Sequence, residues 1–193
     1  MTVLYAKPDD KQKRVRICID AGDGEGNVLN VSFGTYTSLG SPGRGDLISD
    51  KNFSDLQFED ETYRALKKAV TYLTAADKSR YELKAKLLSQ GFSRDACDVA
   101  IEKCVAYGYL DETRQVERLV EREANYKLRG RYHVKRKLMA KGYSSGDVDR
   151  AIARLVERGE IDFDANFESL AQKRGVESDE ERFALKYKFG YKI

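Results

Sequence analysis

The sequence contains no tryptophan, two prolines, one histidine and three cysteines. Both prolines, Pro8 and Pro42, lie near the N-terminus, so proline breaks no helix in the rest of the chain. There is no apolar run of about 20 residues, which argues against a membrane-spanning helix, and the first residues do not resemble a signal peptide. We therefore expect a soluble, cytoplasmic protein without a membrane partner.

The scarce cysteines and the single histidine exclude several kinds of site. Cys18, Cys97 and Cys104 are odd in number and form no CxxC pair, which argues against a disulfide framework and a zinc site. Cys97 and Cys104 share one face of an expected helix and are interpreted as core thiols. His133 has no nearby serine or cysteine nucleophile, and the acidic residues are spread along helix faces. We expect no catalytic residue, no metal and no cofactor, and hence no enzyme.

Charge is abundant and unevenly distributed. Charged residues make up 35% of the chain and aromatic residues 10%, which is typical of a folded protein with a highly charged surface. Residues 1–60 carry a net charge of −3, whereas residues 61–193 carry +6. This basic excess allows an anionic partner without requiring one.

Two stretches of the chain are closely similar. Tyr81–Ser93 reads YELKAKLLSQGFS, and Tyr132–Ser144, 51 residues further on, reads YHVKRKLMAKGYS. The match extends without a gap from residues 81–111 to residues 132–162 and keeps glycines and aspartates in register. A constant offset of this kind indicates an internal repeat rather than two unrelated amphipathic helices.

Each repeat is expected to contain three helices. Ser79 and Glu82 form a capping-box pattern, and Gly91 fits the position that follows a helix end. Asp111 is expected to begin a long helix that runs to about Leu128. The next two helices are expected at about 132–141 and 146–158, and Asp162 opens a third unit that the sequence does not complete.

Before residue 59 the pattern is that of strands. Val15–Ile19 and Val28–Phe33 alternate apolar and polar residues around the loop DAGDGEGN, which predicts a β-hairpin rather than a phosphate-binding loop. The first ten residues are polar and expected to be frayed, and a short strand or helix is expected around Leu47–Phe58. Because an isolated hairpin is marginally stable, we expect it to pack on the first helices.

These patterns predict a mainly α protein of tandem three-helix repeats with a small N-terminal β-hairpin subdomain. A single three-helix unit would expose apolar surface that stacked neighbours cover. The predicted divisions are residues 1–58 for the hairpin subdomain and linker, 59–110 for the first repeat, 111–161 for the second, and 162–193 for a truncated third.

One helix stands out for its charge. Leu128–Lys141 reads LRGRYHVKRKLMAK and contains no acidic residue, whereas Glu82 dilutes the basic charge of its counterpart in the first repeat. Closely packed like charges repel, so an anionic partner, either nucleic acid or an acidic protein groove, would stabilise them. An ordinary solvated basic face is the alternative. The candidate partner-binding residues are Arg129, Arg131, Lys135, Arg136, Lys137 and Lys141, with Arg80, Lys84 and Lys86. No aromatic spacing typical of a single-strand binder is evident, so base stacking is not predicted.

These motifs, in this order, resemble the RecX family of regulatory proteins. The resemblance rests on SRYELKAKLLSQGF (Ser79–Phe92), GYLDE (Gly108–Glu112) and RGRYHVKRKLMAKGYS (Arg129–Ser144). The segment LGSPGRGDLIS (Leu39–Ser49), which runs into DETYRALKKAVTYL (Asp60–Leu73), resembles the β-hairpin extension of longer members. The resemblance covers essentially the whole chain.

The resemblance implies a curved, elongated molecule that binds the RecA recombinase filament in its helical groove. Such a protein inhibits the ATPase, strand-exchange and co-protease activities of RecA and favours filament disassembly, which implies a role in recombination, DNA repair and the SOS response. Some members are reported to contact DNA, single- or double-stranded. We expect a monomer whose basic cluster faces the filament, so that reversing Lys135, Arg136 and Lys137 to glutamate weakens inhibition.

The chain departs from the family pattern in two places. Many members have a proline and a glutamate where this chain has Arg131 and Lys137, which makes the helix more basic, and the third repeat is shorter than in longer members. Two other functions stay open: a helical-repeat nucleic-acid-binding protein that acts independently of RecA, and a scaffold for another protein partner. The first predicts steeply salt-dependent binding to bare DNA.

Overall fold

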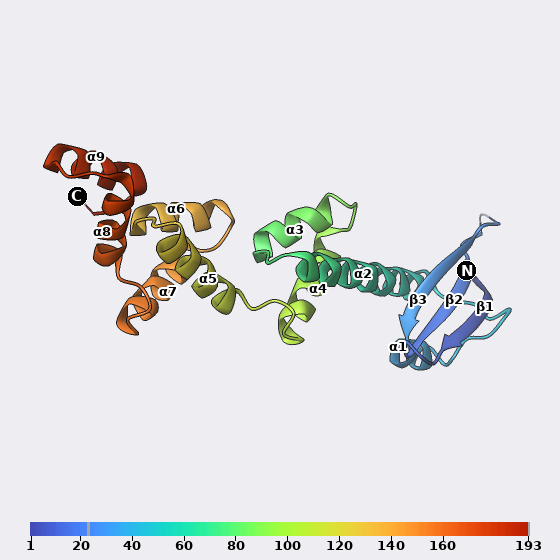
Figure 1. Cartoon of the computed structure of the whole chain (residues 1–193). Coiled ribbons are helices and arrows are strands. Elements are labelled where there is room, and N and C mark those ends of the chain that lie inside the picture. The colour runs from blue at the N-terminus through green and yellow to red at the C-terminus, as the bar shows by residue number, and fades with distance from the viewer. Residues whose placement is uncertain (23, 193) are drawn as a thin grey trace. The chain divides into compact units, whose positions relative to one another are not determined.

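The computed structural model describes residues 1–22 and 24–192, in which a three-stranded sheet is followed by a series of helices (Figure 1). The predicted mainly α class with a small N-terminal β subdomain is therefore confirmed. The chain divides into two compact units, one of residues 1–71 with 86–106 and one of residues 72–85 with the part from 107 onward. Because these units cut across the first repeat, the four-part division of the chain stays a prediction.

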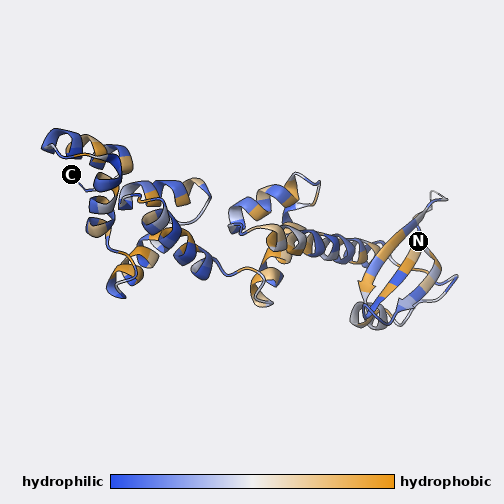
Figure 2. Cartoon of the chain, viewed as in Figure 1, coloured by the Kyte–Doolittle hydropathy of each residue, from blue (hydrophilic) through white to orange (hydrophobic). Residues whose placement is uncertain are grey.

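The first unit begins with an antiparallel sheet in the order β1–β2–β3. The strands are β1 (Thr2–Asp9), β2 (Arg14–Asp20) and β3 (Gly26–Ser32). The predicted hairpin corresponds to β2 and β3, on which apolar and polar residues alternate (Figure 2). Its connecting loop includes position 23, which lies outside the described residues.

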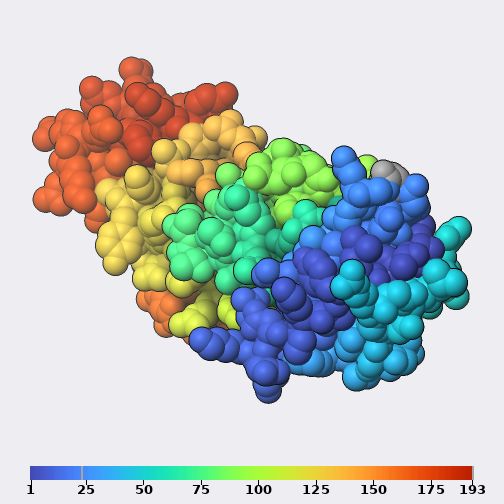
Figure 3. Space-filling view, turned by 90° about the vertical axis from the view of Figure 1, so that its right-hand side faces the viewer, coloured from blue at the N-terminus to red at the C-terminus, as the bar shows by residue number. Residues whose placement is uncertain are grey.

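The expectation that the first ten residues are frayed was wrong, because they form β1. Val3 is only 1% exposed and packs with Ile17 and Val31 in the core of this unit. At the outer edge of β1, the Val3 N–H donates to the Asp46 carbonyl oxygen at 2.9 Å. Figure 3 shows this later segment alongside the N-terminal strands. Burial and edge pairing together order a segment whose composition is mostly polar.

Two carboxylates cover the outer edge of β3. Glu59 accepts a hydrogen bond from the Ser32 N–H at 2.6 Å, and Asp60 accepts one from the Asn30 N–H at 2.9 Å. Asp60 is 4% exposed. Unpaired strand edges invite pairing with other chains, so these side chains take the place of a neighbouring strand.

The carboxylates belong to α2 (Asp50–Ala75), which follows the short helix α1 (Phe33–Ser38). The short element expected around residues 47–58 is mostly the first part of this long helix. Phe53 and Leu56 of α2 are buried against the sheet, which confirms that the hairpin packs on the first helices.

The second and third helices of the first repeat are α3 (Arg80–Leu88) and α4 (Arg94–Ala106), and its first helix is the later part of α2. Helix α3 begins directly after Ser79, the predicted capping residue. The Ser79 hydroxyl accepts from the Glu82 N–H at 3.1 Å, and the Glu82 carboxylate accepts from the Ser79 N–H at 3.3 Å. This reciprocal arrangement is a capping box. Buried Cys97 and Cys104 confirm the prediction of core thiols, and burial raises the pKa of Cys104.

The second repeat lies entirely in the second unit. It contains α5 (Glu112–Glu121), the π-helical turn η1 (Arg122–Tyr126), α6 (Arg131–Ala140) and α7 (Ser145–Glu157). The helix expected to run to about Leu128 is thus α5 extended by η1. A π-helical turn places more residues in each turn than an α-helix does, and here Glu123 and Ala124 are buried within it.

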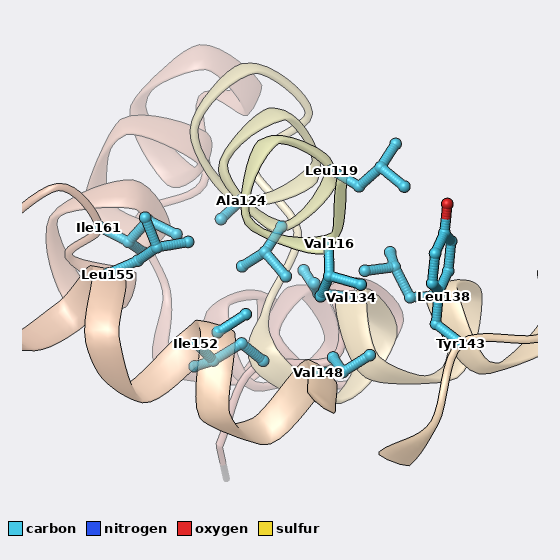
Figure 4. Close-up of a cluster of buried hydrophobic side chains, with 12 residues drawn as sticks. Val116, Leu119, Ala124, Val134, Leu138, Tyr143, Val148, Ile152, Leu155 and Ile161 are labelled. Atoms are coloured by element: carbon cyan, nitrogen blue, oxygen red, sulfur yellow. The ribbon is translucent and has the colours of Figure 1, made fainter. Parts of the chain in front are cut away.

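The core of the second repeat is made by all three helices. Val116 from α5, Leu138 from α6 and Ile152 from α7 are each no more than 1% exposed and lie in one cluster (Figure 4). Burying a valine, leucine or isoleucine side chain contributes about 1.5–3 kcal/mol. The amphipathic pattern therefore has a direct energetic basis in helix packing.

The third repeat contributes α8 (Phe163–Arg174) and α9 (Asp179–Phe189), and no helix follows α9 in the described part of the chain. Phe167 and Leu170 of α8 pack with Leu185 of α9, with Tyr191 and with Leu128 from the preceding repeat. The core of the third repeat is therefore continuous with a residue of the second.

The beginning of α3 contacts the turn that follows α6. The Ser79 hydroxyl donates to the Lys141 carbonyl oxygen at 2.6 Å. Gly142 has a φ of +86°, and a Cβ atom there would lie 2.6 Å from the Cβ of Tyr81. Glycine is needed here both for the left-handed backbone and for the close approach of Tyr81.

Gly142→Ala is expected to lower the free energy of unfolding by about 2–4 kcal/mol, because the left-handed backbone costs alanine about 1–2 kcal/mol and Tyr81 must also move. The matched control is Gly159→Ala, since Gly159 has a φ of +70° and no atom near the added methyl group. The control should lose only about 1–2 kcal/mol. Denaturant unfolding measures both, and equal losses would contradict the contact with Tyr81.

Candidate partner-binding surface

The basic residues of helix α6 are exposed to different degrees. Val134 and Leu138 point into the core, whereas Arg131, Tyr132 and Arg136 are exposed and Lys135 and Lys137 are half-buried. Arg136 lies on the side of the helix away from Val134 and Leu138, whereas Arg131 is exposed at the first position of the helix. The predicted basic helix is present, but its cations have different environments.

Two of the predicted cations neutralise a buried carboxylate. Glu123 of η1 is 1% exposed, and its Oε2 lies 2.7 Å from Lys137 Nζ and 3.4 Å from Arg129 Nε. An isolated buried carboxylate costs several kcal/mol, so these cations stabilise the second repeat. Lys137 and Arg129 are therefore structural residues.

Two further cations form pairs between helices. Lys135 Nζ lies 2.5 Å from Asp149 Oδ2, which connects α6 to α7. Arg80 Nε lies 3.4 Å from Glu112 Oε2, which connects α3 to α5. Both pairs are partly exposed, and such pairs contribute about 0–1 kcal/mol each. Lys84 is half-buried on α3, and Lys86 is exposed near the end of that helix.

Arg131, Arg136 and Lys141 differ from these four residues. Within residues 1–22 and 24–192 the structure gives none of them a carboxylate partner. The Arg136 guanidinium lies 5.9 Å from the ring centroid of Tyr132 and 3.4 Å from Nε2 of His133. These cations are available to a partner without breaking an internal ion pair.

A second basic segment, which the sequence reasoning missed, lies beside the start of α6. Residues 182–192 contain no acidic residue, and the end of α9 contacts the first turn of α6. The Gly130 N–H donates to the Phe189 carbonyl oxygen at 2.8 Å, and the Tyr132 N–H donates to the Gly190 carbonyl oxygen at 3.0 Å. Free N–H groups at a helix start require acceptors, and α9 supplies them here.

The two segments share a basic surface. Arg131 of α6 and Lys186 and Lys192 of the α9 segment line one hollow of about 360 Å³, which Asp164 and Glu168 of α8 also line. We define the α6–α9 basic surface as Arg131, Arg136, Lys186 and Lys192. A search for other segments lacking acidic residues could have identified Lys186 and Lys192, although not their position beside α6.

His133 adds no charge to this surface at neutral pH. Burial lowers its pKa from the usual 6.5, and the neighbouring Arg136 and Arg129 lower it further. In the unfolded chain the imidazole takes up a proton more readily than in the folded protein. Stability is therefore lost as the pH falls through about 6.5, because protonation favours unfolding.

Neither a membrane-spanning helix nor a metal-binding cluster is found in the described ranges. No helix there is both long enough and apolar enough to cross a membrane. Likewise, no three histidine, cysteine or acidic side chains gather there in a way that could hold a metal ion.

Glu123→Gln is expected to lower the free energy of unfolding by about 1–3 kcal/mol. This is less than the loss on breaking a fully buried pair, because water can reach Lys137 and Arg129. Glu157→Gln, which alters an exposed carboxylate on α7, should change stability by less than about 0.5 kcal/mol. A Glu123→Gln/Lys137→Met variant should recover part of the loss. Denaturant unfolding of all three checks this, and a neutral Glu123→Gln would contradict the structural role.

The single histidine allows a direct titration. The imidazole proton resonances of the native protein are expected to titrate with a midpoint below that measured in denaturant. Between pH 7.5 and 5.5, the free energy of unfolding should fall less in His133→Gln than in the wild-type protein. A native midpoint above the denatured one would contradict the assigned environment.

Known proteins resemble this chain in sequence. Residues 65–104 match the family model described as the first three-helix domain of RecX. The regulatory protein RecX of Stenotrophomonas maltophilia strain R551-3 is 30% identical over 64% of this chain and 72% of its own length. That of strain K279a is 32% identical over 56% of this chain and 64% of its own. That of Clostridioides difficile strain 630 is 27% identical over 68% of this chain, which spans 60% of the length of that relative.

Two solved structures share the fold. The crystal structure of a regulatory protein RecX matches with a TM-score of 0.71 and 16% identity, over 98% of this chain and 92% of its own. The crystal structure of RecX from Lactobacillus salivarius matches with a TM-score of 0.56 and 20% identity, over 67% and 86% respectively. The arrangement of strands and helices, the tandem repeats and the sequence relatives agree, and the chain belongs to the RecX family of regulatory proteins.

Proposed function

We propose that this protein binds the RecA recombinase filament and inhibits its ATPase, strand-exchange and co-protease activities. The observation that carries the proposal is that the chain belongs to the RecX family. The resemblance to that family implies RecA as the partner. The α6–α9 basic surface supports it, because Arg131 and Arg136 lack an internal carboxylate partner among the described residues.

The proposed mechanism is a shift of the filament between conformations. A ligand changes an equilibrium only by its differential affinity for the two states. If the basic surface binds the inactive or dissociating arrangement of RecA subunits more tightly, ATPase and strand exchange decline together. Complementary charge would accelerate association and fix the orientation of binding.

The ion pairs of Lys135 and Lys137 determine which residues can be substituted to test the binding surface. Lys135→Glu would place a carboxylate beside Asp149, and Lys137→Glu would place one beside buried Glu123. Reversing these two lysines would weaken inhibition through loss of folding as readily as through loss of contact. The triple reversal expected from the sequence is therefore a poor test, and the exposed arginines are a better one.

We expect Arg131→Glu/Arg136→Glu to raise the concentration for half-maximal inhibition of RecA ATPase about tenfold or more, a change of about 1.4 kcal/mol. Its circular dichroism should stay helical. The matched control is Lys51→Glu/Lys173→Glu, which makes the same change of charge at exposed residues of α2 and α8. The control should inhibit within about twofold of wild type.

The measurement is ATP hydrolysis by RecA on single-stranded DNA at fixed salt, with this protein titrated at substoichiometric ratios. Inhibition well below one copy per RecA supports action on the filament. Inhibition that appears only when the DNA is saturated would instead indicate competition for the strand. No inhibition at any ratio would contradict RecA as the partner.

A further inference from the structure

A hollow of about 700 Å³ lies between strand β3 and helix α2, within the first unit. Strand β3 is an edge strand, since the order in the sheet is β1–β2–β3 and its outer side has no neighbouring strand in the described ranges (Figure 1). The lining residues are Asn27, Val28, Leu29 and Asn30 of β3 and Ser54, Gln57, Phe58, Asp60, Glu61 and Arg64 of α2. The hollow therefore follows an unpaired strand edge.

Side chains of α2 block only part of this edge. The N–H groups of Asn30 and Ser32 point outward, where Asp60 and Glu59 accept them. The pairing of β2 with β3 is regular over the whole of β3, and alternate residues of such a strand point their backbone groups to the same side. The N–H and carbonyl oxygen of Val28 therefore also point outward. Neither has a hydrogen-bond partner in the part of the chain that the structure describes.

The other edge strand is protected, whereas this end of β3 is not. Strand β1 contains Lys7 and Pro8, and its beginning is covered by the segment around Asp46. Lysine and proline on an edge strand discourage pairing with another chain, because proline donates no hydrogen bond and lysine resists burial. Gly26, Asn27 and Val28, the first residues of β3, include neither type. Their backbone groups are open to an added strand.

Apolar side chains adjoin the open edge. Val28 is 47% exposed and Phe58 is 41% exposed, and buried Leu29 also lines the hollow. Successive side chains of a strand point to opposite faces, so every second side chain of an added strand would lie on the face where Leu29 packs. An apolar side chain there would remove part of the Phe58 ring from water, which is favourable.

The charge of the hollow favours a basic partner. Among its lining residues the cation is Arg64, whose Nε lies 2.8 Å from Oδ2 of buried Asp60. Glu61 accepts hydrogen bonds from the N–H and the hydroxyl of Ser93, at 2.6 and 2.8 Å, but forms no ion pair within residues 1–22 and 24–192. Residues 1–60 carry a net charge of −3 as well. A lysine or arginine of a partner would complement this carboxylate.

We propose that the open end of β3 binds an extended peptide segment of another protein, which adds a strand to the sheet at Val28. Backbone hydrogen bonds to Val28 supply affinity in this mode of recognition, and pockets for alternate side chains supply specificity. The segment has apolar side chains that contact Phe58 and a lysine or arginine near Glu61. The site lies in the first unit and involves neither RecA nor the α6–α9 basic surface.

The test is fluorescence anisotropy of a labelled synthetic peptide, RVRVRVRV, titrated with the full chain at fixed salt. Val28→Pro removes the outward N–H and should weaken binding about tenfold or more. An edge strand tolerates proline where the N–H faces solvent, so the unfolding curve should change little. Val28→Thr is the matched control, because it keeps the N–H and the branched side chain, and it should bind within about threefold of wild type.

Two further peptides test the contacts on the unchanged protein. The same peptide methylated at every backbone nitrogen keeps its charge and side chains and should bind about tenfold or more weakly. The acidic peptide EVEVEVEV should also bind more weakly than RVRVRVRV. The proposal is overturned if RVRVRVRV does not bind, if either altered peptide binds equally well, or if Val28→Pro binds it as the wild type does.

Amide hydrogen exchange locates the bound peptide. In the free protein the Val28 amide should exchange faster than that of Leu29, whose N–H faces β2. The peptide should slow exchange at Val28, and unchanged exchange there would place binding elsewhere and overturn the proposal. Slow exchange at Val28 without peptide, together with a doubled mass in light scattering, would assign the edge to a second copy of this chain instead. RecA is absent throughout, so failure of peptide binding and failure of RecA inhibition are observed separately.

Discussion

The second unit depends on contacts between consecutive repeats. In each of them, a turn of one repeat contacts the start of a helix in the repeat before it. The beginning of α3 meets the turn after α6, and the beginning of α6 meets the turn after α9. In α6 no side chain caps the helix start, since the N-cap residue is Gly130, and the carbonyl oxygens of Phe189 and Gly190 accept the free N–H groups instead. A repeat of this kind is complete only beside its neighbour, which is the physical basis of stability in tandem repeats.

This contact also determines which charges face solvent. Joining α6 to α9 brings together two segments without acidic residues, while buried Glu123 and half-exposed Asp149 bind Lys137 and Lys135 of α6. The cations of one short helix are thereby divided between those that stabilise the fold and those that are open to a partner. Net charge alone does not distinguish the paired cations from the unpaired ones, because the distinction depends on where the carboxylates lie.

Local patterns predicted much of the fold and less of the surface. The capping box at Ser79 and the helical periodicity depend on residues a few positions apart, so the sequence alone predicted them. Strand β1 pairs along its length with β2, and its outer edge pairs with a segment more than 40 residues away, so its polar composition was misleading. The predicted basic helix is present. Which of its cations form internal ion pairs could not be predicted from the sequence, because Glu123 and Asp149 each lie 14 residues from the lysine they bind.

The hydrogen bonds at Phe189 and Gly190 have a practical consequence for handling the protein. These two residues are part of the start of a helix nearly 60 positions earlier, so proteolytic trimming at the end of α9 would act on α6 as well. Loss of a single turn would release the first N–H groups of α6 and separate the two basic segments in one event.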